Sequence, residues 1–163
     1  MTLSVGSKLP QATLKRLGAN GIEDIDLGAY IKGRKVVIFA VPGAFTPTCA
    51  KEHLPGYITH SGDIKAKGID EIICIAVNDP FVMAHWEDVS GAKGKVTLLS
   101  DGNCAFTKAA GMDFDGSGAG LGMRSRRYSM IVEDGTITHM AVEEAPGKHE
   151  LSSATACMTK LAG

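Results

Sequence analysis

Two short apolar runs constrain the fold of this chain more than any other feature. Val36–Val41 reads VVIFAV and Glu71–Val77 reads EIICIAV, and neither shows the alternation of a half-exposed strand. Each run is therefore predicted to be a strand buried on both faces. The stretch 49–67 between them favours helix, with a break predicted near Pro55 and Gly56. Together they predict a βαβ unit with parallel strands.

The remainder of the chain continues this alternation. The Asp-Gly pair at 134–135 predicts a tight turn between two strands, and the glycine-rich stretch 111–122 predicts a loop. Further strands are expected at 95–99, 127–132 and 136–142, and further helices at 81–89, 103–110 and 152–161. The pattern predicts an α/β fold in which a central mixed β-sheet is flanked by helices on both faces.

The composition fits one domain over residues 1–163 and argues against some classes of partner. Of the 163 residues, 44% are hydrophobic and 21% are charged, which suits a single core. The net charge of -1 favours neither nucleic acid nor an anionic membrane. The N-terminal residues contain no apolar stretch as long as that of a signal peptide. No segment of the chain approaches the roughly 18 apolar residues that are needed to span a membrane. We expect a cytoplasmic protein with no nucleic-acid or membrane partner.

The four cysteines are far apart in the sequence. Cys49, Cys74, Cys104 and Cys157 form no CxxC pair, and none has the neighbours of a zinc site. We therefore expect no metal, no cofactor and no disulfide scaffold. In a reducing compartment each thiol is then either a small buried apolar group or a reagent.

Cys49 has the surroundings of a reagent. It follows the first predicted strand, and ligands of α/β sheets bind beyond the carboxyl ends of strands. Pro47 suits a helix start because its missing N–H is not needed there. In a first helical turn, unpaired N–H groups and the helix dipole favour thiolate over thiol. Thr46 stands one turn earlier, where its hydroxyl can approach the sulfur.

A thiolate that attacks a peroxide O–O bond also needs donors for the charge that develops on the departing oxygen. A guanidinium group would supply them. Three arginines begin the predicted strand after the glycine-rich stretch, and the residues alone do not choose among Arg124, Arg126 and Arg127.

The alternative is that Cys49 is an inert packing residue and that Thr46 is only a helix cap. The sequence between strand and cysteine, PGAFTPT, favours the reactive interpretation, because small residues and two prolines form a shaped, open loop more readily than a core.

PGAFTPTC, at 42–49, resembles the motif of the peroxiredoxins, specifically the peroxiredoxin-5-like or type II branch. The resemblance continues through VNDPFVM, KVTLLSDGN and RRYSMIVEDG and covers nearly the whole chain. It implies a thioredoxin-like fold and a thiol peroxidase. In this family Cys49 would be the peroxidatic nucleophile, Thr46 its hydrogen-bonding partner and Pro42 a shield against water. The resemblance also selects Arg127 among the three arginines.

The chain departs from some relatives in one respect. Where they carry a resolving cysteine before the last helix, this chain has HELSS at 149–153. Cys74 and Cys157 are expected to be buried and inert. Cys104 is left open as a resolving thiol.

The resemblance implies hydrogen peroxide and alkyl hydroperoxides as substrates, and a homodimer. With no evident resolving cysteine, we expect recycling by glutathione with glutaredoxin, and thioredoxin is the alternative reductant. The rival function is a redox sensor or thiol-dependent chaperone that uses the same cysteine without turnover.

Overall fold

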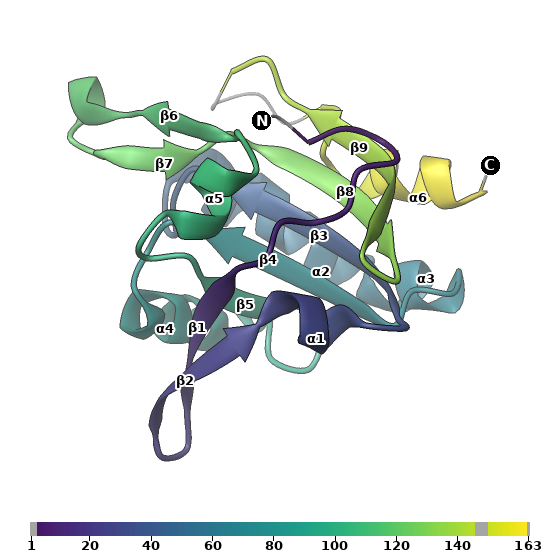
Figure 1. Ribbon diagram of the computed structural model, residues 1–163, viewed down its shortest axis with the longest axis horizontal. Coiled ribbons are helices and arrows are strands. Elements are labelled where there is room, and N and C mark those ends of the chain that lie inside the picture. The colour runs from purple at the N-terminus through teal and green to yellow at the C-terminus, as the bar shows by residue number, and fades with distance from the viewer. Residues whose placement is uncertain (1–2, 146–149, 163) are drawn as a thin grey trace.

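The computed structural model describes residues 3–145 and 150–162, and in these residues a seven-stranded sheet forms the centre of the molecule (Figure 1). Its strand order is β2-β1-β5-β4-β3-β8-β9. The three central strands are parallel, whereas the outer pairings are antiparallel, so the predicted mixed sheet is confirmed. The strands are β1 (Thr13–Gly18), β2 (Gly21–Asp26), β3 (Lys35–Val41), β4 (Glu71–Ala76), β5 (Thr97–Ser100), β8 (Tyr128–Glu133) and β9 (Thr136–Val142).

The βαβ unit predicted from the two apolar runs is present. β3 and β4 pair in parallel, with Val36 opposite Glu71 and Val41 opposite Ala76. After its first residue, each of the two strands is buried along its whole length. Because these strands lie in the middle of the sheet with helices on both sides, neither face needs polar side chains.

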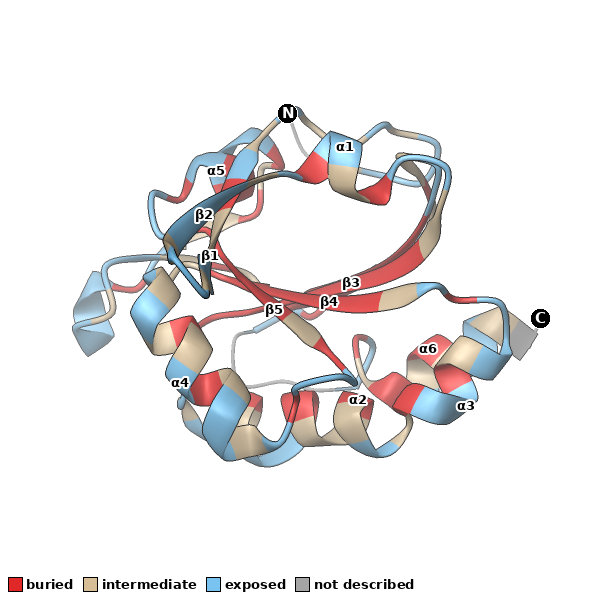
Figure 2. Cartoon of the chain, turned by 90° about the horizontal axis from the view of Figure 1, so that it is seen from below, coloured by how far each residue is buried: buried red, intermediate tan, exposed pale blue. Residues whose placement is uncertain are grey.

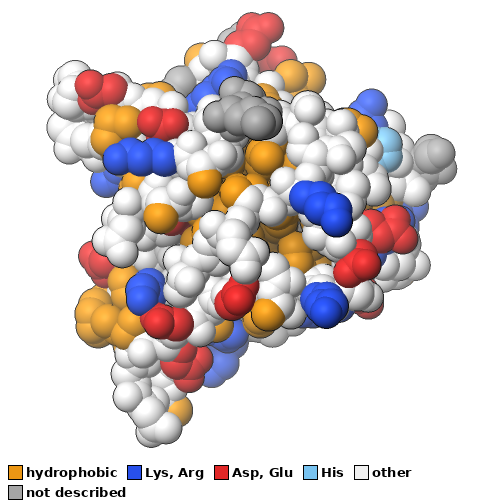
Figure 3. All heavy atoms as spheres, viewed as in Figure 1, with side chains coloured by type: hydrophobic (Ala, Val, Ile, Leu, Met, Phe, Trp, Pro, Cys, Tyr) orange, Lys and Arg blue, Asp and Glu red, His pale blue; other side chains and the backbone are white. Residues whose placement is uncertain are grey.

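Helices cover both faces of the sheet, as predicted (Figure 2). α1 (Leu27–Ile31) and α5 (Ala105–Ala109) lie on one face. Four others lie on the opposite face: α2 (Leu54–Thr59), α3 (Ser61–Ala66), α4 (Pro80–Ser90) and α6 (Ala154–Ala162). The face with α1 and α5 shows hydrophobic side chains at its centre (Figure 3). The two helical layers give two apolar clusters, one on each side of the sheet.

Two local predictions were wrong, and one hairpin was missed. The helical crossover is interrupted at His60 and not at Pro55, which lies just after the π-helical turn η1 (Cys49–His53) in a helix that continues through it. The stretch 111–122 is more than a loop: it contains β6 (Asp113–Asp115) and η2 (Ser117–Ala119), a 3-10 turn. β6 pairs with β7 (Met123–Ser125) to make a small second sheet. The hairpin of β1 and β2 was not predicted.

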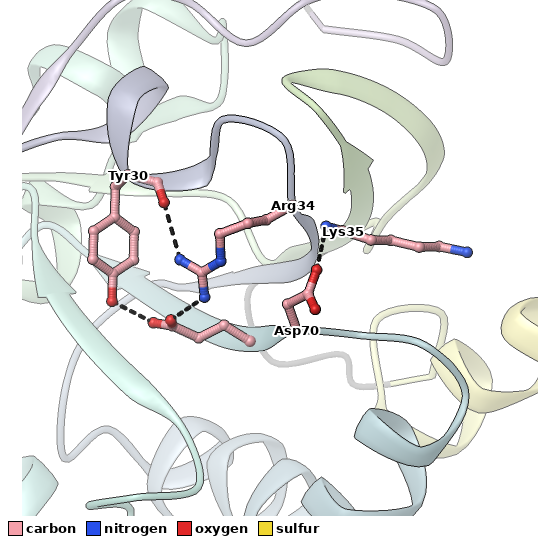
Figure 4. A network of polar contacts seen from close by, with 5 residues as sticks. Tyr30, Arg34, Lys35 and Asp70 are labelled. Carbon is pink, nitrogen blue, oxygen red and sulfur yellow. Dashed lines mark hydrogen bonds and ion pairs between the residues drawn. The ribbon is translucent and has the colours of Figure 1, made fainter.

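A network of polar contacts closes the amino end of β3 (Figure 4). The Glu71 carboxylate accepts from the Tyr30 hydroxyl at 2.6 Å and from Arg34 Nη2 at 2.5 Å. Arg34 Nη1 also donates to the Tyr30 carbonyl oxygen at 2.9 Å, and the backbone N–H of Lys35 donates to Asp70 at 2.9 Å. These contacts join α1, β3 and β4 at the end of the sheet that lies away from Cys49.

Candidate active site

Cys49 lies in the first turn of a helix, at the carboxyl end of β3, as predicted. The helical conformation begins at Pro47 and passes into a π-helical turn, η1 (Cys49–His53), in which the Leu54 N–H donates to the Cys49 carbonyl oxygen. π-Helical turns inside α-helices are rare and frequently mark functional sites. The Cys49 side chain is fully buried, in the apolar cluster beside α2.

The segment between β3 and Cys49 is less open than the sequence predicted. Pro42, Gly43 and Ala44 are buried, and the Ala44 N–H donates to the Asn78 side-chain oxygen at 2.9 Å. This contact fastens the loop to the carboxyl end of the neighbouring strand β4. The small residues therefore allow close packing, and Pro42 is buried with them.

Thr46 is half-buried at the end of this loop. Its hydroxyl donates to the Gly43 carbonyl oxygen at 2.7 Å, and its own carbonyl oxygen accepts from the Ala50 N–H at 2.8 Å. Among the contacts described here the hydroxyl makes no hydrogen bond to Cys49. It fixes the loop, and its lone pairs can still accept from a substrate.

The guanidinium group of Arg127 contacts the sulfur of Cys49. β8 runs antiparallel to β3, and the pairing of Ala40 with Tyr128 places Arg127 at the carboxyl end of β3. Its Nη2 lies 2.9 Å from Cys49 Sγ, and the side chain is 2% exposed. This contact places a buried guanidinium donor on the buried sulfur.

The other two arginines differ from each other. Arg126 is half-buried and lines a hollow of about 160 Å³ that Arg127 and Glu143 also line. Arg124 donates through Nε to the Leu121 carbonyl oxygen at 2.8 Å and through Nη1 to the Pro42 carbonyl oxygen at 3.4 Å. Arg124, one of the three candidate arginines, thus braces the loop before Cys49.

His53 is a further residue of this site, and the sequence did not identify it. It is fully buried, with Nδ1 at 2.7 Å from Arg127 Nη1 and Nε2 at 3.0 Å from the Ser152 carbonyl oxygen. Arginine can only donate and a carbonyl can only accept. The ring is therefore the tautomer that carries its proton on Nε2, with Nδ1 accepting from Arg127.

The other three cysteines are buried, which confirms the prediction for Cys74 and Cys157. Burial, followed by the charge of Cys49, raises the pKa of the Cys74 thiol. Burial, followed by the charge of Asp101, raises the pKa of Cys104. Burial raises the pKa of Cys157 to about 11. Thiols of this kind react slowly at neutral pH.

Exposed aromatic side chains flank the site. Phe45 is 48% exposed and Phe81 59% exposed, and the ring centroids of Phe45 and His85 are 6.0 Å apart. Phe45 also has a backbone φ of 65°, an unfavourable conformation for a bulky residue.

In the part of the chain that the structure describes, no group of His, Cys, Asp or Glu could hold a metal ion, and no helix is long and apolar enough to cross a membrane.

Comparisons with known proteins agree with this geometry. The family described as Redoxin matches residues 4–157. Among curated proteins, the chain is 47% identical over 158 residues to chloroplastic Peroxiredoxin-2E-2 of Oryza sativa subsp. japonica, covering 94% of this chain and 70% of that protein.

Solved structures give the same result. The reduced Prx3 of Vibrio vulnificus in complex with H₂O₂ superimposes with a TM-score of 0.94 at 43% identity, covering 98% of this chain and 99% of that one. Peroxiredoxin 5 of Alvinella pompejana gives a TM-score of 0.84 at 31% identity, covering 98% of both chains. The thioredoxin-like fold predicted by the resemblance is confirmed.

Proposed function

The chain belongs to the peroxiredoxin family of thiol peroxidases, in its type II, peroxiredoxin-5-like branch, and on that premise we propose that Cys49 is its single peroxidatic cysteine. Arg127, Thr46 and Pro42 complete the proposed site. The observation that carries this assignment is the contact of 2.9 Å between Arg127 Nη2 and Cys49 Sγ, because it places a buried cation on a buried sulfur.

The proposed reaction is attack of the Cys49 thiolate on one peroxide oxygen. A sulfur–oxygen bond forms, the O–O bond breaks, the sulfur is oxidised by two electrons to a sulfenic acid, and the departing oxygen takes a proton to leave as water or an alcohol. Arg127 holds the thiolate and donates to the oxygens as charge moves onto them. Thr46 fixes the approach, and Pro42 limits access of water to the sulfur.

Hydrogen peroxide and alkyl hydroperoxides are the proposed substrates. The Vibrio vulnificus relative is described in complex with H₂O₂, which supports a peroxide at the corresponding site. The half-buried Thr46 and the exposed Phe45 form the outer surface of the loop that encloses Cys49. An apolar side chain at this surface would favour the organic group of a small alkyl hydroperoxide.

We propose that an external thiol reduces the sulfenic acid. The described part of the segment before α6, residues 150–153, has no cysteine, and the three remaining thiols are buried with raised pKa values. Glutathione with glutaredoxin is the proposed reductant, and thioredoxin is the alternative.

Assembly, location and domain organisation complete the proposal. Exposed apolar side chains of Phe45, Phe81 and Val89 lie on the active-site loop and α4, where a second copy could cover them in a homodimer. The net charge of -1 supports the absence of nucleic-acid and membrane partners. A cytoplasmic location stays a prediction from the sequence. A single domain over residues 1–163 also stays a prediction.

The experiment is peroxide consumption by the purified protein with the glutaredoxin and thioredoxin systems in parallel. We expect repeated turnover with hydrogen peroxide, faster with glutaredoxin and glutathione. Faster turnover with thioredoxin would change the reductant and leave the peroxidase intact. Oxidation of Cys49 once per chain, without turnover in either system, would support the redox sensor or chaperone instead.

A further inference from the structure

A chain of buried hydrogen bonds leads from the end of β9 to the sulfur of Cys49. Glu143 is 3% exposed, and its Oε2 accepts from the Ser152 N–H and from the Ser152 hydroxyl, both at 2.6 Å. It also accepts from the Glu150 N–H at 3.0 Å. One carboxylate oxygen thus holds the segment that precedes α6.

Ser152 connects the Glu143 carboxylate to His53, which contacts Arg127. It is fully buried, and its carbonyl oxygen accepts from His53 Nε2 at 3.0 Å and from the Tyr57 hydroxyl at 2.8 Å. The His53 ring lies against Phe39, with centroids 4.7 Å apart, so packing and hydrogen bonding together fix the ring. His53 Nδ1 then accepts from Arg127.

The same glutamate also holds the backbone of Arg127. The Glu143 N–H donates to the Arg127 carbonyl oxygen at 2.9 Å, beyond the end of the ladder between β8 and β9. Arg127 is therefore restrained at both ends: at its backbone by the Glu143 N–H, and at its guanidinium through Ser152 and His53.

The electrostatic surroundings of Glu143 agree with this role. Partial burial raises the pKa of its carboxyl, but the hydrogen bonds from Ser152 and from the backbone of residues 150–152 outweigh burial, and the net pKa is lowered. The group is a carboxylate at neutral pH, able to accept several hydrogen bonds at once.

We propose that Glu143 is a positioning residue for the peroxidase reaction. It fixes Ser152, Ser152 fixes the tautomer of His53, and His53 fixes the Arg127 guanidinium against Cys49. This inference rests on the proposed function of Cys49. A buried carboxylate whose only task was to close the segment before α6 would leave the reaction of Cys49 unchanged when it was replaced.

The test measures how fast hydrogen peroxide oxidises Cys49, followed by the fluorescence of Trp86, the chain's one tryptophan. Glu143→Gln keeps the size of the side chain and removes its charge. We expect it to slow oxidation about tenfold, equivalent to the loss of one well-made hydrogen bond. Ser152→Ala should slow it less, because the backbone donor remains. The control is Glu144→Gln, at the exposed neighbouring position, and it should react like the wild type.

Two further measurements separate positioning from support of the fold. In a His53→Ala background, Glu143→Gln should have no additional effect, since it is proposed to act through His53. In ¹⁵N spectra of the imidazole, the wild type should show a proton on His53 Nε2, and Glu143→Gln should show a mixture of tautomers. Thermal unfolding identifies any variant that has lost its fold. If Glu143→Gln does not fold, the rate of Cys49 oxidation in Ser152→Ala decides the proposal.

A rate for Glu143→Gln within about twofold of the wild type would overturn the proposal, as would additive effects with His53→Ala or an unchanged His53 spectrum. If instead wild-type Cys49 failed to react with peroxide, the proposed function would fail first. The wild-type rate therefore distinguishes the two failures.

Discussion

Two arginines lie at opposite ends of β3 and differ in their contacts and in their burial. Arg34 precedes the strand and pairs with the carboxylate of Glu71, at 2.5 Å. Arg127 lies beyond the other end, and its partners include a sulfur and the lone pair of an imidazole. Arg34 lies in a half-exposed network, whereas Arg127 is almost entirely buried.

From this difference we expect Arg34 to contribute to stability and Arg127 to the proposed chemistry. The pairing of Arg34 with Glu71 neutralises both charges in the folded protein. At Arg127 one guanidinium nitrogen touches the reacting sulfur, while the other is aligned by His53. Substitutions at the two ends should therefore separate loss of rate from loss of stability.

The largest effect is expected at the sulfur itself. Cys49→Ser should abolish peroxide turnover, because the proposed nucleophile is gone while the fold remains. Peroxide consumption with an excess of reductant measures this. Cys74→Ser, Cys104→Ser and Cys157→Ser are the controls and should keep most of the activity. Loss of recycling by thioredoxin in any one of them would identify a resolving cysteine and contradict the one-cysteine mechanism.

The two arginines themselves give the next largest contrast. Arg127→Ala should slow oxidation of Cys49 by about a hundredfold or more, the usual cost of losing one transition-state donor. Arg34→Ala should leave this rate unchanged and lower the free energy of unfolding by about 1–2 kcal/mol. Stopped-flow oxidation and denaturant unfolding measure the two quantities.

Arg126→Ala is the matched control within the same strand region. It should retain nearly the wild-type rate, because its side chain does not reach Cys49. Arg124→Ala should slow the reaction moderately, since Arg124 braces the Pro42 carbonyl. If Arg126→Ala were the crippling change, the assignment of Arg127 would be wrong.

A smaller loss of rate is expected for Thr46→Val. Valine keeps the shape of threonine and removes the hydroxyl that donates to the Gly43 carbonyl oxygen. Oxidation should slow about tenfold, with little change in thermal unfolding. Thr48→Val, two residues further along and directly before Cys49, shows whether the same substitution elsewhere in this segment has an equal effect. An equal loss in both variants would remove the special role of Thr46.

The smallest effect concerns pH at the amino end of β3. Partial burial raises the pKa of Glu71, but the hydrogen bonds from Tyr30 and Arg34 outweigh it, so the net pKa lies below the ordinary value of 4.5. The network therefore stabilises the fold above pH 4.5, and this contribution is lost as the pH falls below it. Glu71→Gln should unfold with a weaker dependence on pH in this range, and its rate of Cys49 oxidation at neutral pH should stay unchanged. Denaturant midpoints measured between pH 3 and 7 would show this.

The sequence predicted the centre of the fold because burial there is continuous. The apolar runs around Val37 and Ile73 can only be read as buried strands. β1 and β2 were missed because most of their residues are exposed or half-exposed and mix charged with apolar side chains. The stretch 111–122 concealed β6, since glycines obscured a strand of three residues.

The candidate site divides in the same way. Cys49 and Thr46 were found because their chemistry follows from neighbours in the sequence. Arg127 was selected among three arginines only by the family resemblance. His53 was missed because its partners Arg127 and Ser152 lie 74 and 99 residues away, and a histidine on a helix carries no sign of such distant contacts. Glu143 was missed for a different reason: its side-chain partners Glu150 and Ser152 lie only 7 and 9 residues away, but a glutamate after a predicted strand carries no sign that it is buried.

The pairing of β3 with β8 also determines when the sulfur of Cys49 gains its guanidinium donor during folding. Cys49 and Arg127 are separated by 78 residues, so the loop between them must close before the two side chains come into contact. On a ribosome, a nascent chain that ends before Arg127 has the cysteine without this donor. Under the proposed mechanism, fast reaction with peroxide would therefore require the completed tertiary structure, and it would report whether a newly made molecule has folded.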